Sequence, residues 1–182
     1  MALAVLGAWI GITVAMWFAA TGSFRTVDRV LETANARSGE GAQPVSPDQT
    51  RLTLRYLASE INRTYFRAYG CAQLVLGTAL FVLILRQTPR DAASLALAGG
   101  MLALAAALTL YLTPEIVAVG RQLDFVPRNP VPPGMARFRT LHAAFTALDG
   151  AKLLSGFALL ARLVWPAERG VPKNTEAGRG VR

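Results

Sequence analysis

Apolar residues gather into four long runs separated by polar segments. The first, residues 2–24, has no charged side chain, and three more follow over about residues 66–86, 92–113 and 139–165. A helix rises about 1.5 Å per residue, so roughly 20 residues cross the hydrocarbon core of a bilayer. Each run has about that length. The pattern therefore predicts an all-α integral membrane protein, a bundle of four transmembrane helices over residues 1–165.

The segment between the first two runs predicts a further helix. After a linker over residues 36–44, Ser46, Pro47 and Gln49 have the pattern of a helix start. Four apolar residues then recur at helical spacing beside a stripe of arginines: Leu54, Leu57, Ile61 and Tyr65, next to Arg51, Arg55, Arg63 and Arg67. We expect an amphipathic helix over residues 46–65 that lies on the cytosolic leaflet with its arginines on lipid phosphates. The alternative is that the stripe docks a partner subunit.

Composition and charge agree with a membrane location. Apolar residues make up 53% of the chain and charged residues 16%, and the mean hydropathy is +0.36. The net charge is +8, but the membrane surface accounts for the basic stripe, so no nucleic acid is expected as a partner. Basic residues are most frequent in the two long loops, which the positive-inside rule places in the cytosol, with both termini outside. Residues 166–182 are expected to form a disordered basic tail.

Small and aromatic residues suggest how the helices pack. Tyr65, Phe66 and Tyr69 precede the second run and are expected at the membrane interface, whereas Trp9 and Trp17 lie within the first run and are interpreted as packing residues. Three runs carry small residues at four-residue spacing, which permits close helix contact: Gly7, Gly11, Ala15 and Ala19; Ala92, Ala96, Gly100, Ala103 and Ala107; Ala143, Ala147, Ala151 and Ser155. We expect these seams inside the bundle first, and at an oligomer interface second.

The fourth run carries polar residues that could form a site. The spacing of His142, Thr146, Asp149 and Lys152 predicts that they share one helix face. A charge inside a membrane helix costs about 2.5–3.5 kcal/mol on insertion scales, so it needs a partner or a function. Two interpretations stay open. Asp149 and Lys152 form a structural ion pair, or the face lines a polar path entered from the cytosol, with His142 near its mouth.

Glu115 follows Pro114 at the end of the third run. By depth it belongs near the level of His142, so the two side chains are candidates to face each other across the bundle. The alternative is an interfacial carboxylate that pairs with Arg121 or Arg139.

His142 is the only histidine and Cys71 the only cysteine. One chain therefore supplies neither a bis-histidine haem site nor a His/Cys metal site. A single imidazole is still able to bind the iron of a haem or the magnesium of a chlorophyll, or to relay protons near neutral pH. The plain alternative is a hydrogen-bonded histidine at a helix start. Nucleotide-binding, C-x-x-C and H-E-x-x-H motifs are absent, so we predict no catalytic residue and no metal site, and enzymatic activity has no positive support in the sequence.

Four short motifs resemble one known family. They are Trp9-Ile10-Gly11, Tyr65-Phe66, Tyr111-Leu112-Thr113-Pro114-Glu115-Ile116 and Phe138-Arg139-Thr140-Leu141-His142. Together, over about residues 9–160, they are similar to the four-helix membrane family related to the eukaryotic transmembrane protein 205. The resemblance implies the four-helix fold, suggests a bacterial inner membrane and directs attention to the region of Glu115 and His142. It implies no agreed activity.

Two functions follow as hypotheses. The first is a non-enzymatic accessory or scaffold subunit of a larger respiratory or photosynthetic membrane complex, or a homo-oligomer, with His142 as a candidate haem or chlorophyll ligand. The alternative is a small transporter or proton-coupled carrier that uses Glu115, Thr146, Asp149 and Lys152. A membrane redox enzyme is a weaker third hypothesis, because it needs a cofactor that the sequence does not demonstrate.

Overall fold

A computed structural model describes residues 1–37, 47–87, 91–127 and 129–165. These residues form helices and no strand: α1 (Ala2–Arg37), α2 (Pro47–Leu85), α3 (Ala92–Ala107), the π-helical segment η1 (Leu108–Leu112), α4 (Thr113–Arg121) and α5 (Met135–Val164). Because α3, η1 and α4 are continuous, the chain has four helices that are long and apolar enough to cross a membrane. The predicted all-α four-helix bundle is confirmed. The predicted tail lies outside the described residues.

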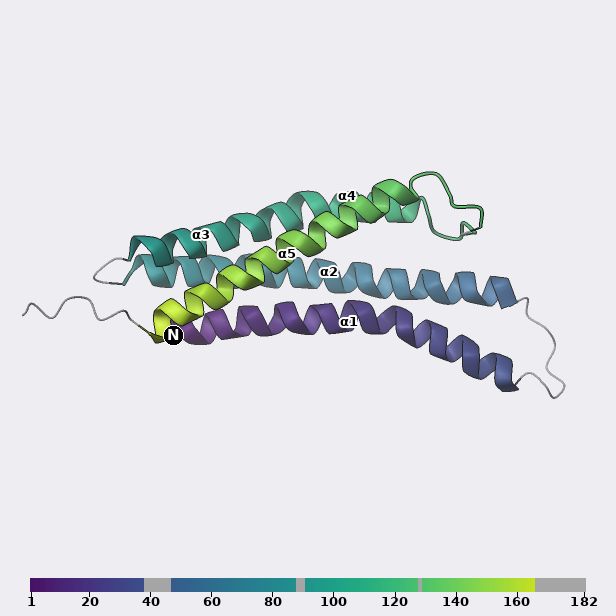
Figure 1. The fold of residues 1–182 in the computed structure, drawn as a ribbon, viewed down its shortest axis with the longest axis horizontal. Coiled ribbons are helices and arrows are strands. Elements are labelled where there is room, and N and C mark those ends of the chain that lie inside the picture. The colour runs from purple at the N-terminus through teal and green to yellow at the C-terminus, as the bar shows by residue number, and fades with distance from the viewer. Residues whose placement is uncertain (38–46, 88–90, 128, 166–182) are drawn as a thin grey trace, which may run out of the picture.

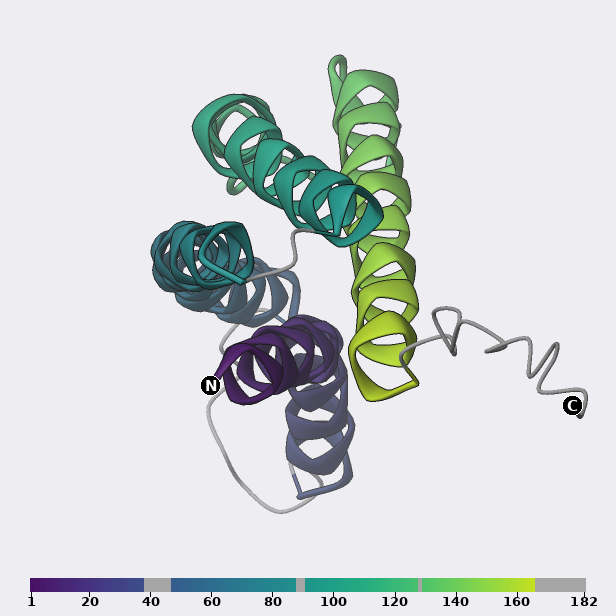
Figure 2. The ribbon, with the colours of Figure 1, turned by 90° about the vertical axis from the view of Figure 1, so that its left-hand side faces the viewer.

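Three of the four long helices run side by side, and α5 crosses them diagonally (Figures 1 and 2). The second half of α5 packs on α1, where an added Cβ at Gly156 would lie 3.3 Å from the Ile10 side chain. The first half instead packs on α4, where Phe138 approaches Gly120. Consequently α1 and α5 diverge toward the end of the bundle that carries residues 122–127. We call this end the loop end.

The helices α1 and α2 are much longer than a membrane span. With 36 and 39 residues, they extend about 54 and 58 Å at 1.5 Å per residue. Beyond the bundle they pack on each other as a pair through Val27, Leu31 and Ala58. The helix predicted before the second span is therefore present, and it continues into that span without a break. No glycine or proline interrupts residues 48–69, so one helix continues from Pro47 to Leu85.

The two predicted stripes of this extension differ in exposure. Leu57 and Ile61 are 54% and 39% exposed, whereas Arg63 is only 7% exposed. Beside Arg63, the Asn62 amide donates to the Ala20 carbonyl of α1, and its oxygen accepts a hydrogen bond from Ser23 at 3.1 Å. The expectation that the arginine stripe lies on the surface is therefore wrong for Arg63, which the contact with neighbouring segments buries.

The small-residue seams lie on the outside of the bundle. An added Cβ at Gly7, Gly11 or Gly100 would meet no atom within 4 Å. Alanines that continue the three series are exposed as well: Ala15, Ala92, Ala96, Ala103, Ala107, Ala143, Ala147 and Ala151. The preferred prediction that these seams pack inside the bundle is wrong, and they are left for lipid or for another subunit.

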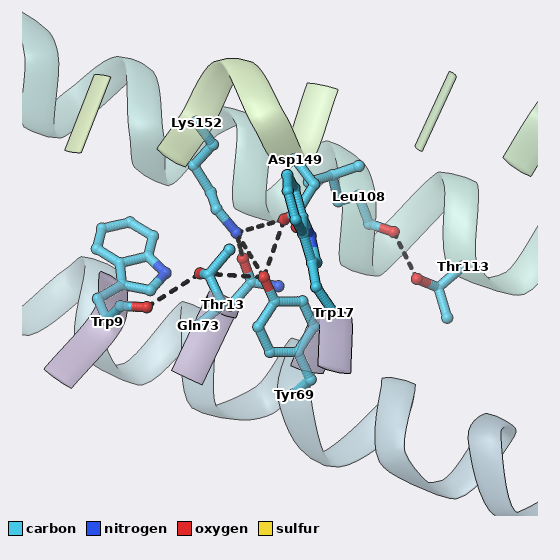
Figure 3. A network of polar contacts seen from close by, with 9 residues as sticks. All are labelled: Trp9, Thr13, Trp17, Tyr69, Gln73, Leu108, Thr113, Asp149 and Lys152. Atoms are coloured by element: carbon cyan, nitrogen blue, oxygen red, sulfur yellow. Dashed lines mark hydrogen bonds and ion pairs between the residues drawn. The ribbon is translucent and has the colours of Figure 1, made fainter. Parts of the chain in front are cut away.

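The close internal approaches instead involve glycines of α2. A Cβ at Gly70 would lie 2.6 Å from the Thr109 methyl group, and one at Gly77 would lie 2.8 Å from the Trp9 ring. Thr109 belongs to η1, which ends just before Pro114. Proline has no N–H to continue the α-helical pattern, and the Thr113 hydroxyl donates to the Leu108 carbonyl at 2.8 Å (Figure 3). The π-helical turn of η1 thus lies where α2 approaches it closely, at Gly70.

At the end opposite the loop end, Asp91 joins the start of α3 to the end of α5. Its carboxylate caps α3, accepting from the Ala93 N–H and the Ser94 hydroxyl, and it also accepts from Arg162. The Ser94 and Arg162 hydrogen bonds lower the pKa of Asp91 from 3.8 to about 2. The carboxylate therefore stays ionised, and the cap intact, at any pH well above that value.

Candidate functional site

A cluster of polar side chains lies buried in the centre of the bundle (Figure 3). Lys152 and Asp149 come from α5, one turn apart, and their side chains are 1% and 0% exposed. The ammonium Nζ lies 2.6 Å from Asp149 Oδ1. It also donates to the Tyr69 hydroxyl at 2.9 Å and to the Gln73 side-chain oxygen. These three acceptors match the three N–H donors of a lysine ammonium group.

Asp149 is held by three helices. Besides Lys152, its Oδ1 accepts from the Tyr69 hydroxyl at 2.9 Å, and its Oδ2 accepts from the Trp17 indole N–H at 2.7 Å. Trp17 was interpreted as a packing residue, but it also binds this carboxylate. The three donors come from α1, α2 and α5, so these helices are joined at a single carboxylate.

Tyr69 is at the centre of the cluster and not at the membrane interface, so the expectation for this aromatic residue is wrong. It is 6% exposed. Its hydroxyl accepts from Lys152 and has two acceptors within reach, Asp149 Oδ1 and Thr13 Oγ1 at 3.1 Å. A phenol carries one hydrogen. It therefore donates to only one of these two acceptors at a time.

Trp9 and Thr13 close the cluster on the α1 side. The Thr13 hydroxyl donates to the Trp9 carbonyl at 3.0 Å, and Lys152 Nζ lies 6.0 Å from the Trp9 ring centroid. Around Trp9, an apolar cluster fills the bundle toward the end opposite the loops: Leu6, Leu80, Ile84, Ala98, Met101, Ala105 and Leu159.

On the other side of the cluster, toward the loop end, is a cavity of about 640 Å³. All four long helices contribute to its wall. Phe66 and Phe145 meet edge to face at its inner end, with ring centroids 5.2 Å apart. Tyr69 and Asp149 lie three and four residues further along the same two helices, about one turn deeper. The aromatic pair is therefore the floor that separates the cavity from the buried charges.

The rim of the cavity carries charge. Arg63 is committed to Glu60 and to Asp124, whose carboxylate lies 2.9 Å from the guanidinium. The cavity is also lined by Arg25, Asp28 and Arg55. Within the described part of the chain, their side chains form no hydrogen bond or ion pair. Of the predicted arginine stripe, only Arg55 and Arg63 face the cavity, while Arg51 and Arg67 are exposed.

His142 lies at this rim. Its ring is exposed, stacks on Phe138 with centroids 6.0 Å apart, and lines the cavity. Thr146 is exposed and its hydroxyl donates to the His142 carbonyl at 3.0 Å. Thr146 lies about 120° around the helix from Lys152 at 100° per residue, so the predicted common face is correct for Asp149 and Lys152 and wrong for Thr146.

Glu115 does not meet His142. Its carboxylate pairs with Arg137 at 2.8 Å, and both side chains are at least a third exposed. Arg121, one of the two partners expected for it, approaches Glu60 at 3.6 Å. Glu115 is thus an exposed carboxylate that forms an ion pair. Its partner is Arg137, and not Arg121 or Arg139 as the sequence analysis suggested.

Two residues of the cluster that the sequence analysis missed do carry a partial signal. Gln73 is the one strongly polar side chain between Gly70 and Leu85, and Thr13 is a hydroxyl within the first apolar run. Polar residues in such positions need a partner in the bundle. Nothing local, however, indicates that side chains 56 to 132 positions apart are joined by hydrogen bonds into one group.

No three His, Cys, Asp or Glu side chains gather to hold a metal ion among the described residues. Comparison of the chain with protein-family models, curated proteins and solved structures gives no match. The resemblance to the transmembrane protein 205 family therefore stays a prediction, and function is argued from the site.

Proposed function

We propose that the chain is a small proton-coupled membrane carrier. The cavity at the loop end is its entrance, and the buried group of Asp149, Lys152 and Tyr69 is its coupling centre. One observation carries the proposal: a fully buried ion pair, bound by side chains from three helices, lies one turn beneath a cavity of about 640 Å³.

The energetic cost of the ion pair favours a function. Helices in a membrane associate through van der Waals packing and close backbone approach, for which α2 already supplies Gly70 and Gly77. Replacing a buried ion pair by apolar side chains of similar volume is often neutral or stabilising. Ionisable residues inside a membrane bundle accordingly mark ion or substrate pathways by default.

The hydrogen bonds supply a coupling mechanism. With Asp149 ionised, Tyr69 donates to it and Lys152 is neutralised by it. A proton on Asp149 removes its negative charge and so weakens both interactions. The Tyr69 hydrogen is then free to turn toward Thr13, and the Lys152 ammonium is left to attract an anion. Since Trp17 of α1 binds the same carboxylate, the proton also changes how α1 is held against α5. Under the positive-inside rule the entrance opens to the cytosol.

A pH-jump experiment tests this proposal. Proteoliposomes adsorbed to a solid-supported membrane are expected to give a transient current when the pH falls, because a proton enters the buried group. The double variant Asp149→Leu/Lys152→Met keeps the packing volume and is expected to abolish that current. Glu115→Gln, which removes an exposed carboxylate, is expected to leave it unchanged. Equal currents in the wild type and the double variant would contradict the coupling role.

A second candidate function has its own observation. Three small-residue seams face outward, with open space beside Gly7 and Gly11, and such surfaces favour close contact with another helix. This supports an accessory or scaffold subunit of a larger membrane complex, or a homo-oligomer. His142 is exposed at the cavity rim, where it is open to a haem or chlorophyll.

Gentle purification from native membranes separates the two candidates. A subunit is expected to co-purify with a stoichiometric partner or a second copy of itself. Gly7→Leu/Gly11→Leu fills the seam and is expected to weaken that association. A tetrapyrrole ligand would add an absorption band that His142→Ala removes. A monomeric, colourless protein would contradict the subunit function and leave the carrier.

A further inference from the structure

The cavity has two chemically different parts. Its inner part is apolar and aromatic, with Phe66 and Phe145 as the floor and Ile116 on the wall. Polar and charged side chains are concentrated toward the rim. A volume of about 640 Å³ is within the usual range of small-molecule sites. A ligand that satisfies both parts has an apolar body and a polar head.

The charge of the rim selects the sign of that head. Three arginines and two aspartates line the cavity: Arg25, Arg55, Arg63, Asp28 and Asp124. Arg63 and Asp124 bind each other, which leaves two guanidinium groups against the single carboxylate of Asp28. Guanidinium groups bind carboxylate, sulfonate and phosphate oxygens in paired hydrogen bonds. The surplus therefore favours an anionic head.

The direction in which the helices diverge favours entry from the membrane interface. α5 leaves α1 after the contacts of Trp17 with Asp149 and Gly150, and the two helices separate toward the loop end (Figures 1 and 2). The cavity is lined by both helices beyond that point. Phe24, on the α1 side, is 43% exposed and continues the aromatic surface outward. An amphiphile is thus able to reach the cavity with its apolar body still shielded.

We infer that this cavity binds a single-chain or aromatic amphipathic anion, with its acidic head on Arg25 and Arg55 and its apolar body against the Phe66–Phe145 floor. The inference names the ligand class of the proposed carrier and so rests on that function, but its test measures binding alone. The same chemistry is offered by an anionic membrane lipid and by a free amphipathic acid.

The test uses fluorescence titration of the full chain in nanodiscs of zwitterionic lipid with a dansyl-labelled undecanoate. We expect saturable binding above that of empty nanodiscs, and none of the corresponding uncharged amide. Arg25→Gln/Arg55→Gln removes the anion contacts and is expected to weaken binding about tenfold or more. Val117→Trp, which fills the cavity without changing its charge, is expected to abolish binding.

The matched control is Arg29→Gln/Arg51→Gln. These arginines are exposed and lie one turn from Arg25 and Arg55 on the same two helices, but they do not line the cavity. The control is expected to bind as the wild type does. Equal weakening by both double variants would overturn the inference, because it would reduce the effect to surface charge, and so would equal binding of the uncharged amide.

Mass spectrometry of the protein purified from its own membranes distinguishes the two sources. An anionic lipid retained by the wild type and lost in Arg25→Gln/Arg55→Gln identifies a membrane lipid as ligand. Dansyl-undecanoate binding without retained lipid identifies a free acid. Absence of both overturns the inference. The double variant Asp149→Leu/Lys152→Met separates the ligand site from the carrier function. If that variant still binds the ligand and its pH-jump current equals that of the wild type, the ligand site is supported and only the carrier function is contradicted.

Discussion

Replacement of Lys152 by methionine is expected to destabilise the protein by about 3–5 kcal/mol, because it leaves the Asp149 carboxylate buried without its cation. The ammonium and carboxylate are 1% and 0% exposed and 2.6 Å apart, so neither is able to find water without opening the bundle. Asp149→Leu is expected to cost a similar amount, since it strands the lysine. Unfolding of each variant in mixed detergent micelles, monitored by helical circular dichroism, measures the loss.

The double variant Asp149→Leu/Lys152→Met is expected to recover most of that stability, because no isolated charge remains. The difference between the single and double variants separates the interaction of the pair from the loss of volume. Arg137→Met provides the matched control on the same helix: it breaks the exposed pair with Glu115 and is expected to cost less than about 1 kcal/mol. Additive losses in the double variant would show that Asp149 and Lys152 do not stabilise each other.

The four-helix fold could be predicted because it depends on length and composition. Each apolar run reaches the roughly 20 residues that a bilayer requires, and the four helices follow. The ends were predicted less well. α1 continues to Arg37, because polar residues such as those after Phe24 end a membrane span without ending a helix. The start of α2 at Pro47, by contrast, agrees with the predicted helix start.

Which faces turn inward could not be read from apolar periodicity. In water an apolar stripe is driven inward, but lipid is as apolar as a leucine side chain, so the driving force for inward packing is weak in a membrane. Within the spans, Phe18 and Leu154 accordingly face outward while Asp149 and Lys152 are buried. Close backbone contact and polar partners determine which face of a helix turns inward, and both depend on the neighbouring helix.

The part of the buried site that lies on one helix could be predicted from the sequence. Asp149 and Lys152 are three residues apart on one helix, and that spacing predicts their contact, which the structure bears out. Tyr69, Gln73 and Trp17 reach them from other helices. Their contribution depends on helix register and on the angle at which α5 crosses, which the local pattern does not contain.

Replacement of Arg63 is the second change expected to reduce stability strongly. It also tests whether this arginine acts on the membrane surface or in a structural ion pair. Its side chain is 8% exposed and joins Glu60 of α2 to Asp124, which follows α4 and is itself 14% exposed. Arg63→Met leaves Asp124 largely buried without a cation. We expect a loss of about 3 kcal/mol, at the lower end for a broken buried pair, since Asp124 retains some contact with water.

Arg67→Met is the matched control, because Arg67 belongs to the same predicted stripe, lies one turn along α2 and is exposed. Its replacement is expected to change stability by no more than about 0.5 kcal/mol. Both variants are compared by unfolding in the same micelles and again in vesicles with and without anionic lipid. If the arginines acted only on lipid phosphates, the two variants would lose stability equally, and only where anionic lipid is present. A loss confined to Arg63→Met and independent of the lipid would instead follow from its bond to Asp124, which fastens the segment after α4 to α2 beside the cavity rim.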